Sequence, residues 1–219
     1  MSQEIAGRAR RRVGPRSAGL LMTPEEFDAL PGSRLVGGYR YELIRGILIV
    51  TPAPGNAEID PNQYLGYLLL MHQEGHPDGS IIDKTLPEQT LATAANRRRC
   101  DRAIWVGLGR VPDPGRDVPA IVVEFVSASR RDRRRDYEEK RDEYLAAGVL
   151  EYWIVDRFQR NMTVYRPGPD GPVATAVPAS GTYTTGLLPG FSLPLNRLLA
   201  KADDWPSRRR RKPPTGADR

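Results

Sequence analysis

The sequence predicts an α/β (α+β) fold, a mixed β-sheet flanked by helices in a single domain. Two observations lead to this prediction. Short apolar segments with turn residues between them indicate hairpins, which pair their strands in antiparallel fashion. A charged segment with helical periodicity also separates two apolar strands, which indicates a crossover connection. The length of 219 residues suits one domain.

The helices are predicted from capping residues and periodicity. Thr23, Pro24 and Glu26 form a capping signature at the start of the first helix. Gly75 and Gly148 are placed to end two later helices. The predicted helices cover residues 22–30, 62–74, 131–147 and the last part of 187–200.

The strands are predicted from apolar content and turn residues. Arg45 and Gly46 divide "YRYELIRGILIV" into a hairpin, and residues 52–61 are predicted as a loop from their Pro, Gly and Asn content. Pro87 places its strand at an edge or a bulge, because proline cannot donate to a neighbouring strand. The predicted strands lie within residues 39–50, 80–91, 100–108, 119–127, 151–156 and 162–167, the last two as an antiparallel pair.

The net charge of +6 is unevenly distributed along the chain. Residues 1–20 hold five arginines and one glutamate, and residues 201–219 hold seven basic and three acidic residues, so each end carries +4. Residues 21–200 carry −2. We therefore expect two basic tails without packed structure around one folded domain. Such tails attract nucleic acid non-specifically, but they are also common as solvated ends.

Composition narrows the function classes. No apolar run approaches the about 20 residues of a membrane span, and the N-terminus lacks the apolar region of a secretory signal. Cys100 is the only cysteine, which excludes an internal disulfide and a thiolate zinc cluster and suits a reducing cytoplasm. His72 and His76 do not form a metal-binding motif and are expected to be polar residues at a helix end. Any metal would be a hard ion held by carboxylates.

Glu124 interrupts the most apolar strand, "IVVEFVSAS". A buried carboxylate requires a positive partner, either a basic side chain or a metal ion. Lys140 lies three residues after Tyr137 and four before Tyr144, so helical spacing places it on the buried face with the two tyrosines. Lys140 can therefore meet Glu124, and an ion pair and a metal ligand both remain open for this glutamate.

Asp101, Glu124 and Lys140 together suit metal-assisted hydrolysis. Two carboxylates, from Asp101 and Glu124, can bind Mg²⁺ (or Mn²⁺) with waters in the other positions. Lys140 would help to position or deprotonate the attacking water, and the attacked group would be a phosphodiester. In the structural alternative, Lys140 only neutralises Glu124.

These residues lie in segments that resemble the Uma-two family of restriction endonucleases. The resemblance runs from about residue 22 to residue 199 and is most specific at Glu-x-Val-Ser-x-Ser followed by Lys, Tyr, Gly-Val and Glu-Tyr-Trp-Ile-Val-Asp. It implies the PD-(D/E)xK nuclease fold, a restriction-endonuclease-like sheet that cuts nucleic acid with a divalent metal. Asp101 matches the motif's aspartate, Glu124 its second acid, and Lys140 the lysine that the family supplies from the next helix. Glu42, in Tyr-Glu-Leu-Ile, matches a further acid near the metal.

A few positions depart from the family pattern. Val126 stands two residues after Glu124, where the superfamily motif has its lysine. Cys100 replaces the proline before Asp101, Arg45 replaces an acidic turn residue, and the loop after the hairpin has no histidine. None of these departures removes Asp101, Glu124 or Lys140.

Two functions from different classes follow from the sequence. The first is a metal-dependent endonuclease acting on DNA, and the second is a nucleic-acid-binding or interaction protein on the same fold with little catalysis. A glycosidase with an acid pair is rejected, because no aromatic-lined cleft is indicated and an inward lysine does not suit that chemistry. A homodimer is also expected, since two-fold symmetry suits the cutting of both strands of a duplex.

Overall fold

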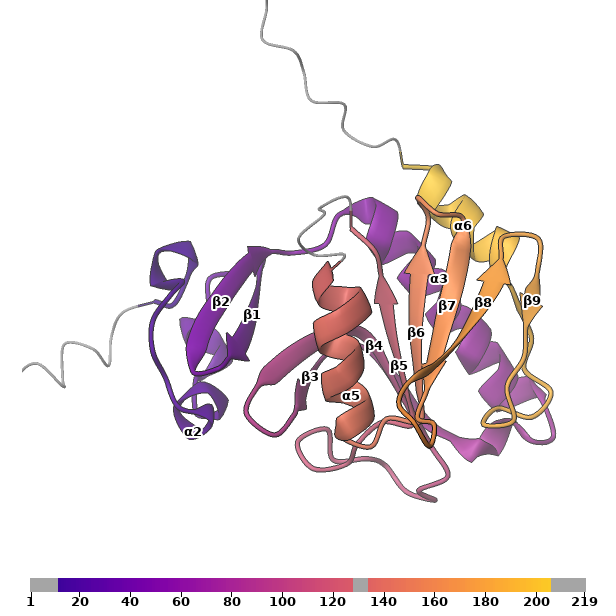
Figure 1. Ribbon diagram of the computed structural model, residues 1–219, viewed down its shortest axis with the longest axis horizontal. Helices are drawn as coiled ribbons and strands as arrows, with labels where there is room; N and C mark the ends of the chain where they lie inside the picture. Colours follow the sequence, from indigo (N-terminus) through magenta and orange to yellow (C-terminus); the bar gives the residue numbers. More distant parts are fainter. Residues whose placement is uncertain (1–11, 128–133, 206–219) are drawn as a thin grey trace, which may run out of the picture.

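A mixed sheet of eight strands runs through the part of the chain that the computed structural model describes, residues 12–127 and 134–205 (Figure 1). The strand order is β2-β1-β4-β5-β6-β7-β8, and β3 pairs with β4. The strands of this sheet are β1 (Tyr39–Ile44), β2 (Ile47–Pro52), β3 (Ile82–Ala92), β4 (Arg97–Val106), β5 (Ile121–Phe125), β6 (Glu151–Asp156), β7 (Asn161–Arg166) and β8 (Val173–Pro178). A second, two-stranded sheet pairs β9 (Thr182–Tyr183) with β10 (Leu193–Pro194).

Helices cover both faces of the large sheet (Figure 1). On one face, α3 and α6 pack their leucines against alternate residues of the central strands. On the other face, α5 contributes Tyr144 to a second cluster with Val122, Tyr152 and Ile154. The helical elements are η1 (Pro15–Ser17), α2 (Pro24–Asp28), η2 (Gly32–Arg34), α3 (Asn56–Gly75), η3 (Gly79–Ile81), η4 (Arg135–Lys140), α5 (Arg141–Ala146) and α6 (Leu195–Asp203). None of the described helices is long and apolar enough to cross a membrane.

The strand connections follow the predicted pattern. Strands β1 and β2 form an antiparallel hairpin, and its turn residues Arg45 and Gly46 have φ angles of 51° and 75°. Strand β5 pairs in parallel with β6 across the crossover that contains α5, and β6 pairs with β7 in antiparallel fashion. Strand β3 pairs only with β4 among the described strands, so Pro87 lies on an edge strand as predicted. The mixed α+β sheet flanked by helices is therefore confirmed.

Helix α3 begins earlier than predicted. The sequence indicated a loop over residues 52–61, but the helix starts at Asn56 and contains Pro61. The physical reason is a cap at its first turn, where the backbone N–H of Gly55 donates to Glu58 Oε2 at 2.7 Å. The prediction of a loop was therefore wrong, and the correction brings Glu58 to the first turn of a helix.

Strand β4 also begins earlier than predicted. Asp101 was expected at its start, but the strand starts at Arg97 and Asp101 lies near its middle. The first residues of the strand were not predicted because they are three consecutive arginines, which are not typical of a buried strand. Each arginine has a carboxylate partner: Arg97 pairs with Asp28 at 2.7 Å, Arg98 with Glu143 at 2.6 Å and Arg99 with Glu88 at 3.0 Å. Their charges are thus compensated by acidic side chains of other elements, which a pattern of apolar residues does not indicate.

The boundaries of the two tails need correction. Val13 is buried and bridges to Leu35, and the backbone N–H of Gly19 donates to the carbonyl of Leu48 at 2.8 Å. Residues 13–20 therefore pack on the hairpin, contrary to the expectation for residues 1–20. At the other end, α6 continues to Asp203, beyond the predicted boundary at residue 200. Residues 1–11 and 206–219 lie outside the described residues.

Candidate functional site

Glu124 and Lys140 form a buried ion pair. Glu124 lies in β5 and Lys140 ends η4, and the Nζ atom of Lys140 donates to Glu124 Oε1 at 2.6 Å. Both residues are at most 2% exposed. Lys140 thus points to the sheet, in the direction that the helical spacing indicates. The Glu124 carboxylate therefore lies inside the fold, and its observed partner is the basic side chain of Lys140.

Lys140 is surrounded by acceptors from four elements. Besides Glu124, its Nζ lies 3.6 Å from Asp136 Oδ1 and 3.9 Å from Glu42 Oε1, and it donates to the carbonyl of Arg99 at 2.9 Å. Burial alone lowers the pKa of Lys140, but the three carboxylates outweigh burial and raise it above its ordinary value. Lys140 is therefore a cation at neutral pH, which argues against its action as a general base.

Glu42 belongs to the same buried cluster. Its Oε1 accepts the backbone N–H of Arg99 at 3.0 Å, and its Oε2 lies 3.7 Å from the Arg135 guanidinium. Burial raises the pKa of Glu42, but Lys140 and Arg135 outweigh burial, so the pKa is lowered. Burial raises the pKa of Glu124 well above its usual range, and Lys140 opposes this shift. Glu42 and Glu124 therefore both interact with the ammonium of Lys140.

A π-helical segment, η4, carries Asp136 and Lys140. Such segments are rare and frequently occur at functional sites. Both side chains are buried, and the hydroxyl of Tyr152 donates to the backbone carbonyl of Asp136 at 3.1 Å. The widened turn therefore presents two residues, four apart, to the same buried cluster.

Asp101 lies where strands β4 and β5 separate. The last pair of this ladder is Arg102 with Val123, and beyond it the backbone N–H of Phe125 donates to Asp101 Oδ2 at 2.6 Å. The other carboxylate oxygen, Oδ1, accepts from the guanidinium of Arg40 in β1. Asp101 thus pairs with Arg40, and no ion pair joins it to Lys140 among the described residues.

The side-chain alternation of β4 breaks at the same place. Successive side chains of a strand point to opposite faces of the sheet. Cys100 and Ala103 are three residues apart, yet both pack in the cluster on the α5 face. Arg102 points to α3 instead, where it donates to Asn62 Oδ1 at 2.7 Å. Asp101 lies within this break, so its side chain does not follow the regular alternation of the strand.

A pocket of about 400 Å³ opens beside Asp101. It lies between the start of β1, the β2–α3 connection, the first turns of α3, and strands β3 and β4. Glu42, Glu124 and Lys140 do not line it, whereas Asp101 does. Its other charged residues, which no sequence pattern indicated as site residues, are Arg40, Glu58, Glu88, Arg99 and Arg102. The spacing of Gly55 and Glu58, which resembles a capping box, was the one signal that could have revealed Glu58.

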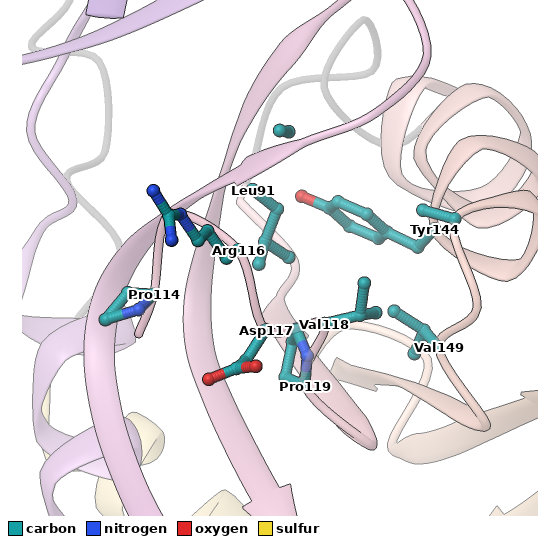
Figure 2. Close-up of a pocket in the computed structure, with 11 residues that line it drawn as sticks. Leu91, Pro114, Arg116, Asp117, Val118, Pro119, Tyr144 and Val149 are labelled. Atoms are coloured by element: carbon teal, nitrogen blue, oxygen red, sulfur yellow. The ribbon is translucent and has the colours of Figure 1, made fainter. Parts of the chain in front are cut away.

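A second hollow is too small for a substrate. It lies between the end of β3, the loop over residues 114–119 and α5, and Figure 2 shows Leu91, Tyr144 and Val149 around it. Its volume is about 30 Å³, which is about that of one water molecule. Tyr144 joins this hollow to the buried cluster, since its hydroxyl donates to Glu124 Oε1 at 3.4 Å.

The donor set of Asp101 and Glu124 fits Mg²⁺ in its chemistry. Mg²⁺ prefers oxygen ligands and is usually held by one or two carboxylates, waters and substrate phosphates. No group of three or more His, Cys, Asp or Glu side chains in the described part of the chain is arranged to hold a metal. Arg40 covers Asp101 Oδ1, so a metal at Asp101 requires this guanidinium to move away.

Comparison with known proteins gives a family and a fold. Residues 24–196 match the model of the Uma2 family, described as "Putative restriction endonuclease". The fold is similar to that of a crystal structure described as a putative nuclease belonging to DUF820 from Anabaena variabilis ATCC 29413, with a TM-score of 0.64. The identity is 14%, and the similarity covers 83% of this chain and 99% of the other. No curated protein sequence matches the chain.

Proposed function

The chain belongs to the Uma2 family, and on this premise we propose that it is a metal-dependent endonuclease that hydrolyses phosphodiester bonds of DNA. The family and the fold suggest a restriction-endonuclease-like nuclease, which implies a nucleic acid substrate. The choice of DNA, the metal and the roles of the side chains are our proposal.

One observation carries the proposal. The buried ammonium of Lys140 donates to Glu124 at 2.6 Å, and the residue after Glu124 donates its backbone N–H to Asp101 at 2.6 Å. Asp101 of β4 is thereby linked to the backbone of β5 next to Glu124, and Glu124 to Lys140 of the following helical segment. This linkage supports the proposed roles of the three residues.

Asp101 and Glu124 would hold the metal, Mg²⁺ or Mn²⁺. A divalent metal supplies Lewis-acid stabilisation of the charge that develops on the phosphate and makes water more acidic. The chain's own groups orient this site: Phe125 fixes Oδ2 of Asp101, and Lys140 fixes Oε1 of Glu124. Because Lys140 stays protonated, we propose that it holds Glu124 in place and adds positive potential near the phosphate, and that it does not remove a proton from water.

The test is cleavage of plasmid and oligonucleotide DNA by the purified protein with Mg²⁺, Mn²⁺ or EDTA. We expect cleavage only with metal, and loss of cleavage in Asp101→Asn and Glu124→Gln. Glu138→Gln and Asp142→Asn are controls for these changes of a carboxylate to an amide. Both carboxylates are more than half exposed, and they lie in η4 and α5, away from the strands of Asp101 and Glu124. Cleavage that persists in EDTA, or in both site variants, would overturn the proposal.

A second candidate is a nucleic-acid-binding protein with little catalysis. The observation in its favour is that Arg40 and the Phe125 N–H occupy both oxygens of Asp101. DNA binding without cleavage under every metal condition would select this candidate. The expected homodimer stays a prediction, and sedimentation of the protein with and without duplex DNA tests it.

A further inference from the structure

The pocket beside Asp101 has two kinds of wall. Tyr39 and Ile59 form an apolar side and are each 37% exposed, which leaves their surfaces free for contact. Gln63, an exposed residue of α3, supplies an amide that can both donate and accept. An exposed aromatic ring beside hydrogen-bonding groups is the combination on which a nucleobase stacks and is held.

The pocket lining also carries three arginines, Arg40, Arg99 and Arg102, beside three carboxylates, Glu58, Glu88 and Asp101. Arg40 and Arg99 both bind Glu88, at 2.8 Å and 3.0 Å from their Nε atoms. Arg102 is 4% exposed, and no carboxylate of a described residue lies within 4.0 Å of it. Its guanidinium donates instead to neutral groups of Asn62 and Thr85.

A buried guanidinium without an anionic partner favours an anion in the adjacent space. Burial lowers the pKa of Arg102 to about 10, which still leaves it charged at neutral pH. Arg99 has a side chain that is 32% exposed, so a phosphate can reach it from the pocket. The pocket therefore combines a surface for a base with cations for its phosphate.

The size of the pocket limits what enters it. A volume of about 400 Å³ lies in the range of sites for single small molecules, about 300–1,000 Å³. A nucleotide is a ligand of this size, whereas a base pair inside a duplex cannot enter. Extrusion of a paired base costs a few kcal/mol, and the cost is smallest for a base that is already unpaired.

We propose that this pocket binds one unpaired nucleotide of a nucleic acid strand, with the base against Tyr39 and the phosphate toward Arg99. The proposal deepens the proposed function and rests on it, because the bound strand would then pass Asp101. It names the substrate class as nucleic acid with unpaired nucleotides: single strands, bulges or frayed ends.

The experiment measures binding in EDTA, so that no cleavage is required. The probe is a ten-nucleotide single strand with one central 2-aminopurine, and the full-length protein is titrated in about 0.3 M salt to screen its charged ends. Competitors are the same sequence as a closed hairpin duplex, a duplex with one bulged nucleotide, and free dAMP. We expect a change in 2-aminopurine emission, with the single strand and the bulge binding at least tenfold more tightly than the closed duplex.

Variants locate the binding. Tyr39→Ala is expected to abolish the emission change and weaken single-strand binding about tenfold, the loss typical of one stacking contact, while Tyr39→Phe retains both. Tyr67→Ala is the matched control, because Tyr67 is 56% exposed on α3 and does not line the pocket. Arg99→Gln should weaken binding, and Arg116→Gln, whose side chain is 87% exposed elsewhere, should not.

Each outcome decides the matter. Equal affinity for the closed duplex and the single strand, or equal loss in Tyr39→Ala and Tyr67→Ala, would overturn the proposal. Equal affinity for dAMP would also overturn it, because the pocket would then be a site for free nucleotide. If the strand binds through Tyr39 but Mg²⁺ and Mn²⁺ produce no cleavage, the nuclease proposal fails and the pocket proposal stands.

Discussion

Substitution of Glu124 by glutamine separates its structural role from its proposed role in catalysis. The amide keeps the shape of the side chain but removes its charge, so it is a poorer partner for both Lys140 and a divalent metal. Glu124 is 2% exposed and Lys140 is 1% exposed, so water cannot solvate the Lys140 ammonium in place of the lost carboxylate. The effect on stability therefore depends on the other carboxylates near the ammonium.

The expected loss of stability is moderate. Removal of one partner of a buried ion pair costs about 3–5 kcal/mol when the other charge is left unpaired. Lys140 is not left unpaired, because Asp136 at 3.6 Å and Glu42 at 3.9 Å remain. With an effective dielectric constant of about 20, these two pairs and the Glu124 pair contribute attractions of about 5, 4 and 6 kcal/mol, so more than half of the attraction persists.

We therefore expect Glu124→Gln to lower the free energy of unfolding by about 2 kcal/mol, or the melting temperature by about 4–8 °C for a domain of this size. Metal-dependent cleavage at a temperature well below the transition should be lost. Calorimetry gives the first quantity, and cleavage of supercoiled plasmid with Mg²⁺ gives the second. Glu138→Gln, at an exposed position of η4, is the control for the general effect of the substitution.

Two results would refute this reasoning. Cleavage at the wild-type rate by folded Glu124→Gln would show that the carboxylate is not needed for chemistry. A loss of 5 kcal/mol or more would show that Asp136 and Glu42 do not compensate Lys140, and the variant would then report only on the ion pair. Loss of cleavage with a moderate loss of stability is the one outcome that supports both parts.

Three further predictions concern the cations. Lys140→Met leaves the buried Glu124 without a cation, while Glu42 and Asp136 keep Arg135 at 3.7 Å. Its free energy of unfolding should fall by about 3–5 kcal/mol, more than in Glu124→Gln, as chemical denaturation would show. Arg40→Gln frees an oxygen of Asp101, so Mn²⁺ should bind more tightly than in wild type when measured by electron paramagnetic resonance; unchanged affinity would contradict this. Deletion of residues 1–11 and 206–219 removes nine basic residues, so DNA binding should weaken and depend less on salt while the melting temperature stays unchanged.

The buried ion pair could be predicted because short-range patterns determine it. Glu124 stands out in an apolar strand, and the spacing of Lys140 from Tyr137 and Tyr144 identifies the inward face of the next helix. The π-helical turn changes the residue spacing, but the prediction still holds, since Tyr144 and Lys140 are both fully buried on the same side. Local periodicity was therefore sufficient to bring two residues together that are 16 positions apart.

The pocket could not be predicted, because its residues are brought together by pairing between distant segments. Arg40 meets Asp101 across 61 positions, and Arg102 meets Asn62 across 40. Arg98 and Arg99 are typical of exposed residues in a sequence pattern, yet Arg98 is buried and both pair with carboxylates of distant segments. Only the register of β1, β3 and β4 determines which cations face Asp101.

The two acids of the proposed metal site are held by cations of different exposure. Lys140 is enclosed by three carboxylates and a backbone carbonyl, and its side chain is 2% exposed. Arg40 lines the pocket with 17% exposure and already binds a second carboxylate, Glu88, through its Nε atom at 2.8 Å. If Arg40 leaves Asp101, it keeps Glu88 as a partner, so its charge stays compensated. Release of Asp101 Oδ1 therefore requires a rearrangement of Arg40 on the pocket side, while the Lys140 cluster keeps Glu124 in place.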